Sequence, residues 1–268
     1  GTNNSFVHVD SDTYALAYEG LDDDGFISTF TISSDGTTIT KVATLEHDTD
    51  TVSNSLVKVD SETLALVHGP SNQDGFISTF TISDDGTTIT KVATLEHDTD
   101  HGEHNSLVKV DSETVALAYE GEDSDGFIST FTISDDGSTI TEVATLEHDD
   151  AGSGGDVIEW NSFVQVDSDT YALAYEGEDN DGFISTFTIS SDGTTITKVA
   201  TLEHDTIGTS NLHNSLVQVD SDTYALAYQG QDDDGFISTF TIDSDGNITA
   251  VKTQSEGNNL EHDAGVMG

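Results

Sequence analysis

The sequence predicts an all-β protein, a closed five-bladed β-propeller with four antiparallel strands in each blade. Three observations predict this fold. One phrase recurs five times at a period of about fifty residues. Apolar side chains alternate with a period of two inside each copy. Turn-forming residues divide each copy into four runs.

The repeated unit has a fixed opening and a fixed ending. Asn-Ser-(Phe/Leu)-Val-x-Val-Asp opens it, and Leu-Glu-His-Asp closes it. The openings begin at Asn4, Asn54, Asn105, Asn161 and Asn214, and the endings at Leu45, Leu95, Leu146, Leu202 and Leu260. We therefore expect one propeller domain over residues 1–268, with blades at approximately 4–48, 54–98, 105–149, 161–205 and 214–263.

Each unit contains four short runs that are rich in β-branched and aromatic residues. In the first unit these runs cover residues 6–9, 14–18, 26–31 and 39–45. The segments between them, residues 10–12, 22–25 and 34–36, are made of Asp, Ser and Gly, which favour tight turns. The pattern indicates four antiparallel strands in each unit.

Strands with apolar residues on both faces need a second sheet on each side, as in a ring of blades. The alternatives are an open β-solenoid and a string of small domains. A solenoid favours atypical terminal repeats, and fifty residues without a disulfide make a marginal domain. Five near-identical blades make the predicted architecture similar to that of tachylectin-like lectins. We expect the last blade to pack on the first, without exchange of strands.

Charge excludes some partners. The chain has 52 Asp and Glu residues against six Lys and Arg, a formal net charge of −46. Nucleic acid and anionic membranes bind clustered cations, so we expect neither as a partner, and no apolar run suggests membrane insertion. Self-repulsion of this size calls for screening ions. We therefore expect a marine or halophilic protein, extracellular or at the cell surface, and monomeric.

Acidic connections link the second and third runs. Asp-x-Asp-Gly offers hard oxygen ligands in a tight turn, so we expect Ca²⁺ or another cation there, and no organic cofactor. The candidate metal ligands are Asp22, Asp24, Asp123, Asp125, Asp179, Asp181, Asp232 and Asp234. The alternative is ordinary turn chemistry. The second unit carries Pro70 here, with His68 where the other units have Glu or Gln, and we expect no cation site in it.

Glu-His-Asp recurs at the end of every unit and provides candidate ligand-binding residues. These are Glu46, His47, Asp48, His97, Asp98, His148, Asp149, His204, Asp205, His262 and Asp263. Alternate residues of a strand point to opposite sides, so the His would face away from both acids, which is poor geometry for one metal. We expect each His to pack between blades and to hydrogen-bond to backbone, and each Asp to cap the next turn.

The units differ most in the loops that join them, and one loop contains the only tryptophan, Trp160. An aromatic ring beside amides and carboxylates is typical of sugar sites. Five copies of one weak site favour multivalent binding. We therefore expect a non-enzymatic binding or adhesion module for a glycan or a cell-surface polymer. The alternatives are a glycoside hydrolase-like enzyme and a structural repeat domain of a surface protein.

Overall fold

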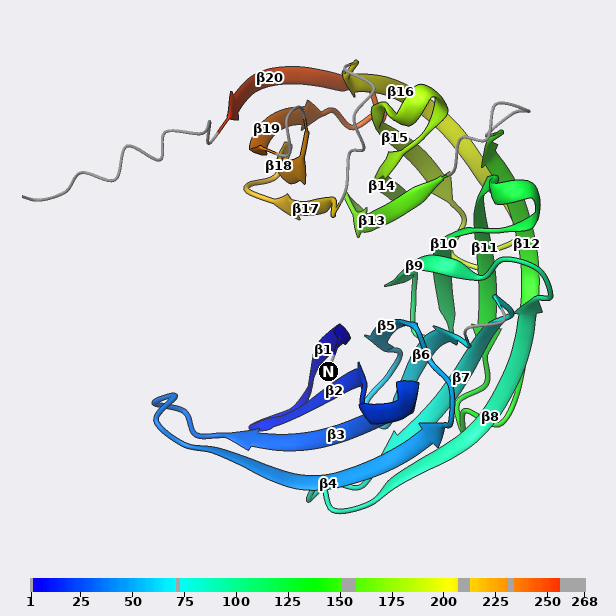
Figure 1. Ribbon diagram of the computed structural model, residues 1–268, viewed down its shortest axis with the longest axis vertical. Helices are drawn as coiled ribbons and strands as arrows, with labels where there is room; N and C mark the ends of the chain where they lie inside the picture. The colour runs from blue at the N-terminus through cyan, green and yellow to red at the C-terminus, as the bar shows by residue number, and fades with distance from the viewer. Residues whose placement is uncertain (1, 71–72, 151–157, 207–212, 231–233, 256–268) are drawn as a thin grey trace, which may run out of the picture.

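The computed structural model describes residues 2–70, 73–150, 158–206, 213–230 and 234–255. Its described part forms five antiparallel sheets of four strands, each sheet in chain order. Figure 1 shows them arranged in an arc, with the first strand of each sheet on the inner side and the fourth on the outer rim. The predicted five-bladed, all-β propeller architecture with four strands per blade is confirmed.

The strand bounds repeat from sheet to sheet. The first sheet is β1 (Thr2–Asp10), β2 (Thr13–Glu19), β3 (Gly25–Ile32) and β4 (Ile39–Asp48). The second is β5 (Ser53–Lys58), β6 (Thr63–Gly69), β7 (Gly75–Ile82) and β8 (Ile89–Asp98). The third is β9 (Glu103–Lys109), β10 (Thr114–Glu120), β11 (Gly126–Ile133) and β12 (Ile140–Asp149). The fourth is β13 (Glu159–Gln165), β14 (Thr170–Glu176), β15 (Gly182–Ile189) and β16 (Ile196–Asp205). The fifth is β17 (Ser215–Gln218), β18 (Thr223–Gln229), β19 (Gly235–Ile242) and β20 (Ile248–Ser255).

The conserved letters of the repeat join neighbouring sheets. In the first four sheets the Ser of the Asn-Ser pair accepts a hydrogen bond from a backbone N–H of the following sheet, as Ser106 Oγ does from Phe163 N at 3.0 Å. In the first four sheets a buried Thr of the third strand donates to the glycine carbonyl of the following sheet's last turn, as Thr130 does to Gly193 at 2.7 Å. The same two bonds recur at the other three junctions. The repeated phrase therefore encodes the contact between blades.

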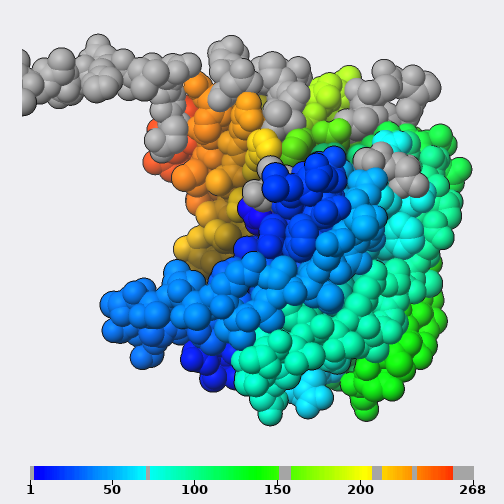
Figure 2. Space-filling view, turned by 60° about the horizontal axis from the view of Figure 1, so that its bottom comes forward, coloured from blue at the N-terminus to red at the C-terminus, as the bar shows by residue number. Residues whose placement is uncertain are grey.

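The first and last sheets do not meet in this structure, and an opening separates them (Figure 1). Phe6 on the first sheet is 53% exposed, whereas the matching Phe163 is 4% exposed against the sheet before it. Ile237 on the last sheet is 46% exposed, whereas Ile184 is fully buried. A Cβ at Gly36 would meet no atom within 4 Å, and the hairpin that bears it projects from the body (Figure 2). The expected packing of blade five on blade one is absent among the described residues.

Strand pairing corrects two alignments made from the sequence. His68 pairs with Phe76 as Tyr18 pairs with Phe26, so His68 replaces a Tyr, and the Glu position is taken by Gly69. In the fifth sheet Phe236 pairs with Ser255, the place that Glu46 holds opposite Phe26. The last strand therefore ends at Ser255 and contains no Glu-His-Asp. The Glu-His-Asp of unit five, with His262 and Asp263, lies outside the described residues.

Candidate functional site

The N-terminal ends of the first strands of four sheets line an open cavity of about 420 Å³. Its lining is rich in amides and carries one imidazole and one indole. The lining residues are Asn3, Asn4, Val52, Ser53, Asn54, Glu103, His104, Asn105, Trp160 and Asn161. They come from β1, β5, β9 and β13 and from the segment ahead of β5, which places the cavity on the inner side of the arc.

Backbone irregularities direct several of these side chains. The residue immediately before the Asn-Ser pair has a positive φ in four units, at Asn3 (49°), His104 (50°), Trp160 (54°) and His213 (63°). In the first, third and fourth sheets the pairing register shifts at this point, as in a β-bulge. Such conformations are costly for residues other than glycine, and bulges re-aim side chains near functional sites. The variable residue ahead of each Asn-Ser pair therefore marks the site.

Carboxylates surround His104. Its Nε2 lies 3.8 Å from Glu120 Oε2 and 3.7 Å from Glu159 Oε1. Glu120 pairs across the ladder with Glu103, and Glu176 with Glu159. Glu120 is 4% exposed and Glu176 is 2% exposed, although each is the last residue of its strand. The third and fourth sheets thus bring Glu103, Glu120 and Glu159 together around one imidazole, with Glu176 beside Glu159.

Burial gives these acids unusual proton affinities. It raises the pKa of Glu120 from 4.5 to about 7, with further increases from Glu159 and Glu103. Burial and the charge of Glu159 raise the pKa of Glu176 to about 7 as well. Burial lowers the pKa of His104. At neutral pH the cluster therefore holds a carboxylic acid able to donate a proton beside a neutral imidazole able to accept one.

The Trp160 ring packs at steep angles against two imidazole rings, those of His104 and His213. The Trp160 ring centroid lies 4.9 Å from that of His104 and 4.1 Å from that of His213. Asn161 Nδ2 donates to the His104 carbonyl at 3.1 Å, which ties β13 to β9. An indole face beside amides suits the apolar face and the hydroxyl groups of a sugar ring. Trp160, singled out from the sequence, thus lies in the cavity.

A metal ion also fits this cluster. One ligand atom each from Glu103, His104 and Glu120 can be chosen so that all lie within 4.8 Å of one another. Two carboxylates and one imidazole are a donor set that divalent transition metals accept. These three residues would hold the ion.

Among the predicted Asp ligands that the structure describes, Asp22, Asp123 and Asp179 are exposed and the others are partly buried. Three of them, Asp22, Asp123 and Asp179, adopt φ near 60° in single 3₁₀ turns over Leu21–Asp23, Glu122–Ser124 and Glu178–Asn180. In the described part of the chain none of these loop carboxylates belongs to a three-residue metal-ligating group. Asp232 lies outside the described residues. The expected Ca²⁺ remains a prediction, with Asp24, Asp125, Asp181 and Asp234 as its other candidate ligands.

The Glu-His-Asp residues lie at the ends of the fourth strands, beside the loops between second and third strands. His148 is 6% exposed and packs edge-on against Tyr175 and Phe187 of the next sheet, at 5.0 and 5.6 Å between ring centroids. His47, His97 and His204 pack in the same way. The predicted packing is confirmed, but the predicted backbone hydrogen bonds are wrong, because neither ring nitrogen of any of these four residues has a partner.

The Asp and the Glu of the motif differ in their contacts. Asp48 Oδ1 accepts the backbone N–H of Thr49, and Asp98 Oδ1 accepts those of Asp100 and His101, which confirms the capping role at these two turns. Glu46 is exposed on the outer strand. Neither the motif nor the loop acids line the cavity around His104. The sequence signal that points to this cavity, and that our sequence-based prediction did not use, is the variable residue ahead of each Asn-Ser pair.

The fold and its rim define a β-propeller with an acidic, imidazole-bearing site on its inner side. No protein-family model and no curated protein sequence matches the chain. Solved structures do. A protein from Lactobacillus plantarum is 16% identical, with a TM-score of 0.69 over 94% of this chain and 70% of its own.

Two further similar solved structures are named after an enzymatic activity. A putative 6-phosphogluconolactonase from Bacteroides uniformis is 13% identical, with a TM-score of 0.70 over 93% of this chain and 71% of its own. The periplasmic gluconolactonase of Pseudomonas aeruginosa is 14% identical, with a TM-score of 0.54 over 91% of this chain and 83% of its own. At identities this low, the similarity establishes the fold alone.

These comparisons correct the expected function. We expected a non-enzymatic carbohydrate-binding or adhesion module, whereas three of the similar solved structures are named as enzymes, two as putative 6-phosphogluconolactonases and one as a gluconolactonase. The expectation rested on five equal sites. The five sheets differ on the inner side, however, because the cluster of Glu120, Glu176, His104 and Trp160 belongs to the third and fourth sheets only. Among the described residues no helix is long and apolar enough to cross a membrane.

Proposed function

We propose that this protein is a hydrolase that opens a sugar-derived lactone in the cavity beside Trp160. The observation that carries the proposal is the buried Glu120 carboxyl, whose pKa is raised to about 7, within 3.8 Å of the His104 imidazole. Burial raises the pKa of the Glu120 carboxyl toward neutrality and lowers that of the His104 imidazole, so at neutral pH the pair offers a proton donor and a proton acceptor for hydrolysis.

The reaction adds water across the ring ester. The neutral His104 imidazole takes a proton from water, whose oxygen attacks the lactone carbonyl carbon. The bond from that carbon to the ring oxygen then breaks, and the protonated Glu120 carboxyl donates a proton to the departing oxygen. The product is the open-chain hydroxy acid. Asn105, Asn161 and the Trp160 ring hold the sugar hydroxyls and the ring face.

The substrate we propose is unphosphorylated. A phosphorylated sugar is usually bound by Arg or Lys, and the sequence has no Arg. No Lys is among the residues that line the cavity in the described part of the chain. A net charge of −46 also repels a phosphate dianion.

The test compares glucono-1,5-lactone with its 6-phosphate, after subtraction of the spontaneous rate. We expect turnover of the neutral lactone only, a fall of about 10²-fold or more in kcat/KM for Glu120→Gln, and loss of the alkaline limb near pH 7 in that variant. Glu113→Gln, an exposed acid in a turn between β9 and β10, is the control and should match the wild type. Absence of turnover on a panel of neutral lactones, or equal rates for wild type and Glu120→Gln, would refute the proposal.

A further inference from the structure

The second sheet differs from the others at one buried position. In the remaining four sheets this position of the second strand is a Tyr whose hydroxyl lies near a Ser of the third strand. In the fourth sheet Tyr175 also donates to Asp149 Oδ2 at 2.5 Å. His68 replaces the Tyr, and its Nε2 takes over the contact with the Ser, lying 3.0 Å from Ser78 Oγ. Its other nitrogen, Nδ1, is left facing the preceding sheet.

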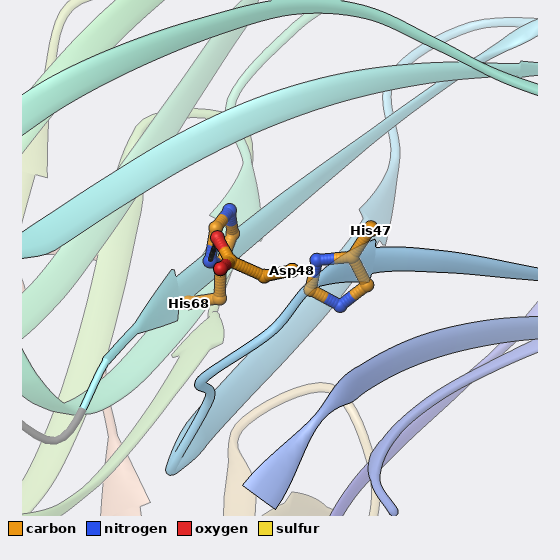
Figure 3. A group of neighbouring side chains, drawn as sticks. All are labelled: His47, Asp48 and His68. Atoms are coloured by element: carbon orange, nitrogen blue, oxygen red, sulfur yellow. Dashed lines mark ion pairs between the residues drawn. The ribbon is translucent and has the colours of Figure 1, made fainter.

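Two residues of the first sheet face that nitrogen. Asp48 Oδ2 lies 3.7 Å from His68 Nδ1, too far for a hydrogen bond. The ring centroid of His47 lies 4.9 Å from that of His68. One ligand atom from each of the three residues can be chosen so that all lie within 4.8 Å of one another. Figure 3 shows the Asp48 carboxylate against His68 and the His47 ring beside it.

A bulge brings His47 and Asp48 together. Gly25 pairs with Asp48, but the next residue, Phe26, pairs with Glu46, so His47 is the extra residue of β4. The strict alternation assumed from the sequence fails here, because a bulged residue disrupts it. From strict alternation we expected His47 to face away from Asp48. The bulge instead lets ligand atoms of His47, Asp48 and His68 lie within 4.8 Å of one another, while Glu46 is not part of this group.

The two histidines of this group contain buried polar atoms without hydrogen-bond partners. His68 is fully buried and His47 is 8% exposed. His68 Nδ1 and both nitrogens of His47 have no hydrogen-bond partner. Burial lowers the pKa of His47 to about 4 and that of His68 well below its usual value, so both rings are neutral at pH 7. Leaving such atoms unpaired costs free energy, and their free lone pairs suit a metal ion.

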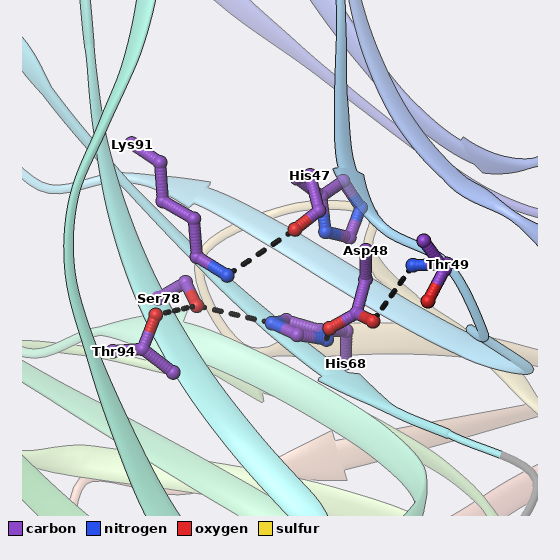
Figure 4. Close-up of polar contacts among 7 residues, drawn as sticks. All are labelled: His47, Asp48, Thr49, His68, Ser78, Lys91 and Thr94. Atoms are coloured by element: carbon purple, nitrogen blue, oxygen red, sulfur yellow. Dashed lines mark hydrogen bonds and ion pairs between the residues drawn. The ribbon is translucent and has the colours of Figure 1, made fainter.

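One cation lies nearby. Lys91 Nζ donates to the carbonyl of His47 at 3.3 Å (Figure 4), and its pKa is lowered by burial and raised in part by Asp48. The ammonium group is held by backbone, not by the three ligand side chains. Its charge should weaken the binding of a second cation without blocking it.

We propose that His47, Asp48 and His68 bind a divalent transition metal, most suitably Zn²⁺, that clips β4 of the first sheet to β6 of the second. Two imidazole nitrogens and one carboxylate oxygen are ligands that Zn²⁺ prefers, and a water would complete the tetrahedron. Bond lengths of about 2.1 Å imply edges of about 3.4 Å, close to the 3.7 Å between Asp48 and His68. The site is separate from the cavity at His104 and independent of the proposed activity.

The repeat supplies matched variants. His68→Tyr restores the residue of the other four sheets, and Tyr175→His should create a second copy of the site with His148 and Asp149. Zn²⁺ binding is measured by calorimetry and by metal analysis after gel filtration, with excess Ca²⁺ and NaCl present to occupy surface acids. Co²⁺ serves as a spectroscopic probe of tetrahedral coordination.

We expect His68→Tyr to bind one equivalent of Zn²⁺ fewer than the wild type, and Tyr175→His to bind one more. Lys91→Gln should bind more tightly than the wild type. A wild-type chain that binds no Zn²⁺ under these conditions, or a folded His68→Tyr variant with the same stoichiometry and affinity as the wild type, would overturn the proposal. If His68→Tyr fails to fold, no gain of metal in Tyr175→His would overturn it instead.

Discussion

Two phenylalanines at the same place in the repeat test the open arc. Phe163 is 4% exposed and packs in a cluster with Ala116 and Ala118 of the preceding sheet, whereas Phe6 is 53% exposed. Phe163→Ala removes a buried ring and leaves a cavity, which costs about 3–5 kcal/mol. Phe6→Ala loses about half of the transfer free energy and leaves no cavity, so we expect about 1 kcal/mol.

Urea unfolding measures both values, and the slope of the free energy with denaturant reports whether the surface exposed on unfolding is unchanged. A cost for Phe6→Ala equal to that for Phe163→Ala would refute the open arrangement. It would mean that in solution Phe6 is covered as Phe163 is, with the face around Ala225 and Ala227 as its nearest counterpart. The pair therefore distinguishes an open arc from a closed ring by a single comparison.

Three further outcomes are expected. Thr130→Val should lower the free energy of unfolding in urea by about 1–3 kcal/mol, because it leaves the buried Gly193 carbonyl without its donor. Thr239→Val should cost less, because the Thr239 hydroxyl bonds only within its own sheet. Equal costs for the two variants would contradict the open arc. Because the pKa of Glu120 is raised from 4.5 to about 7 on folding, the folded state holds an extra proton in that range, so stability should fall as pH rises from about 4.5 to about 7, and Glu120→Gln should flatten this fall in urea titrations. Chelation of metal should lower the Tm of the wild type and leave that of His68→Tyr unchanged; an equal decrease in both would argue against the clip.

The sequence predicts the blades well because the residues that recur in every unit make the contacts within and between sheets. The Ser of Asn-Ser and the Thr of Ser-Thr-Phe form hydrogen bonds between neighbouring sheets, so the same interface recurs wherever these residues recur. Ring closure is different. It depends on the angle between successive sheets, which is set by packing around Phe163 and its equivalents and leaves no mark on residue type.

Two other features escaped the sequence for a different reason. The alignment of the second unit shifted by one residue because Gly69-Pro70 replaces Glu-Gly, and only strand pairing places His68 opposite Phe76. The bulge at His47 breaks an alternation that the sequence itself preserves. In both cases a one-residue change of register decides which side chains meet, and a period-two pattern carries no information about it.

The inner rim shows how a repeat of nearly equal units can hold one unequal site. The last position of the second strand is Glu19, Gly69, Glu120, Glu176 and Gln229 in the five sheets. Glu19 accepts a hydrogen bond from Asn3 at 2.9 Å, Gly69 has no carboxyl, and Gln229 does not ionise. Only Glu120 and Glu176 are both buried and close to further acids, and those acids come from the segments that precede the third and fourth Asn-Ser pairs. The acids with raised pKa are therefore confined to this pair of blades by what the variable segments add, whereas the Glu of the repeat alone would give three ordinary acids, in the first, third and fourth sheets.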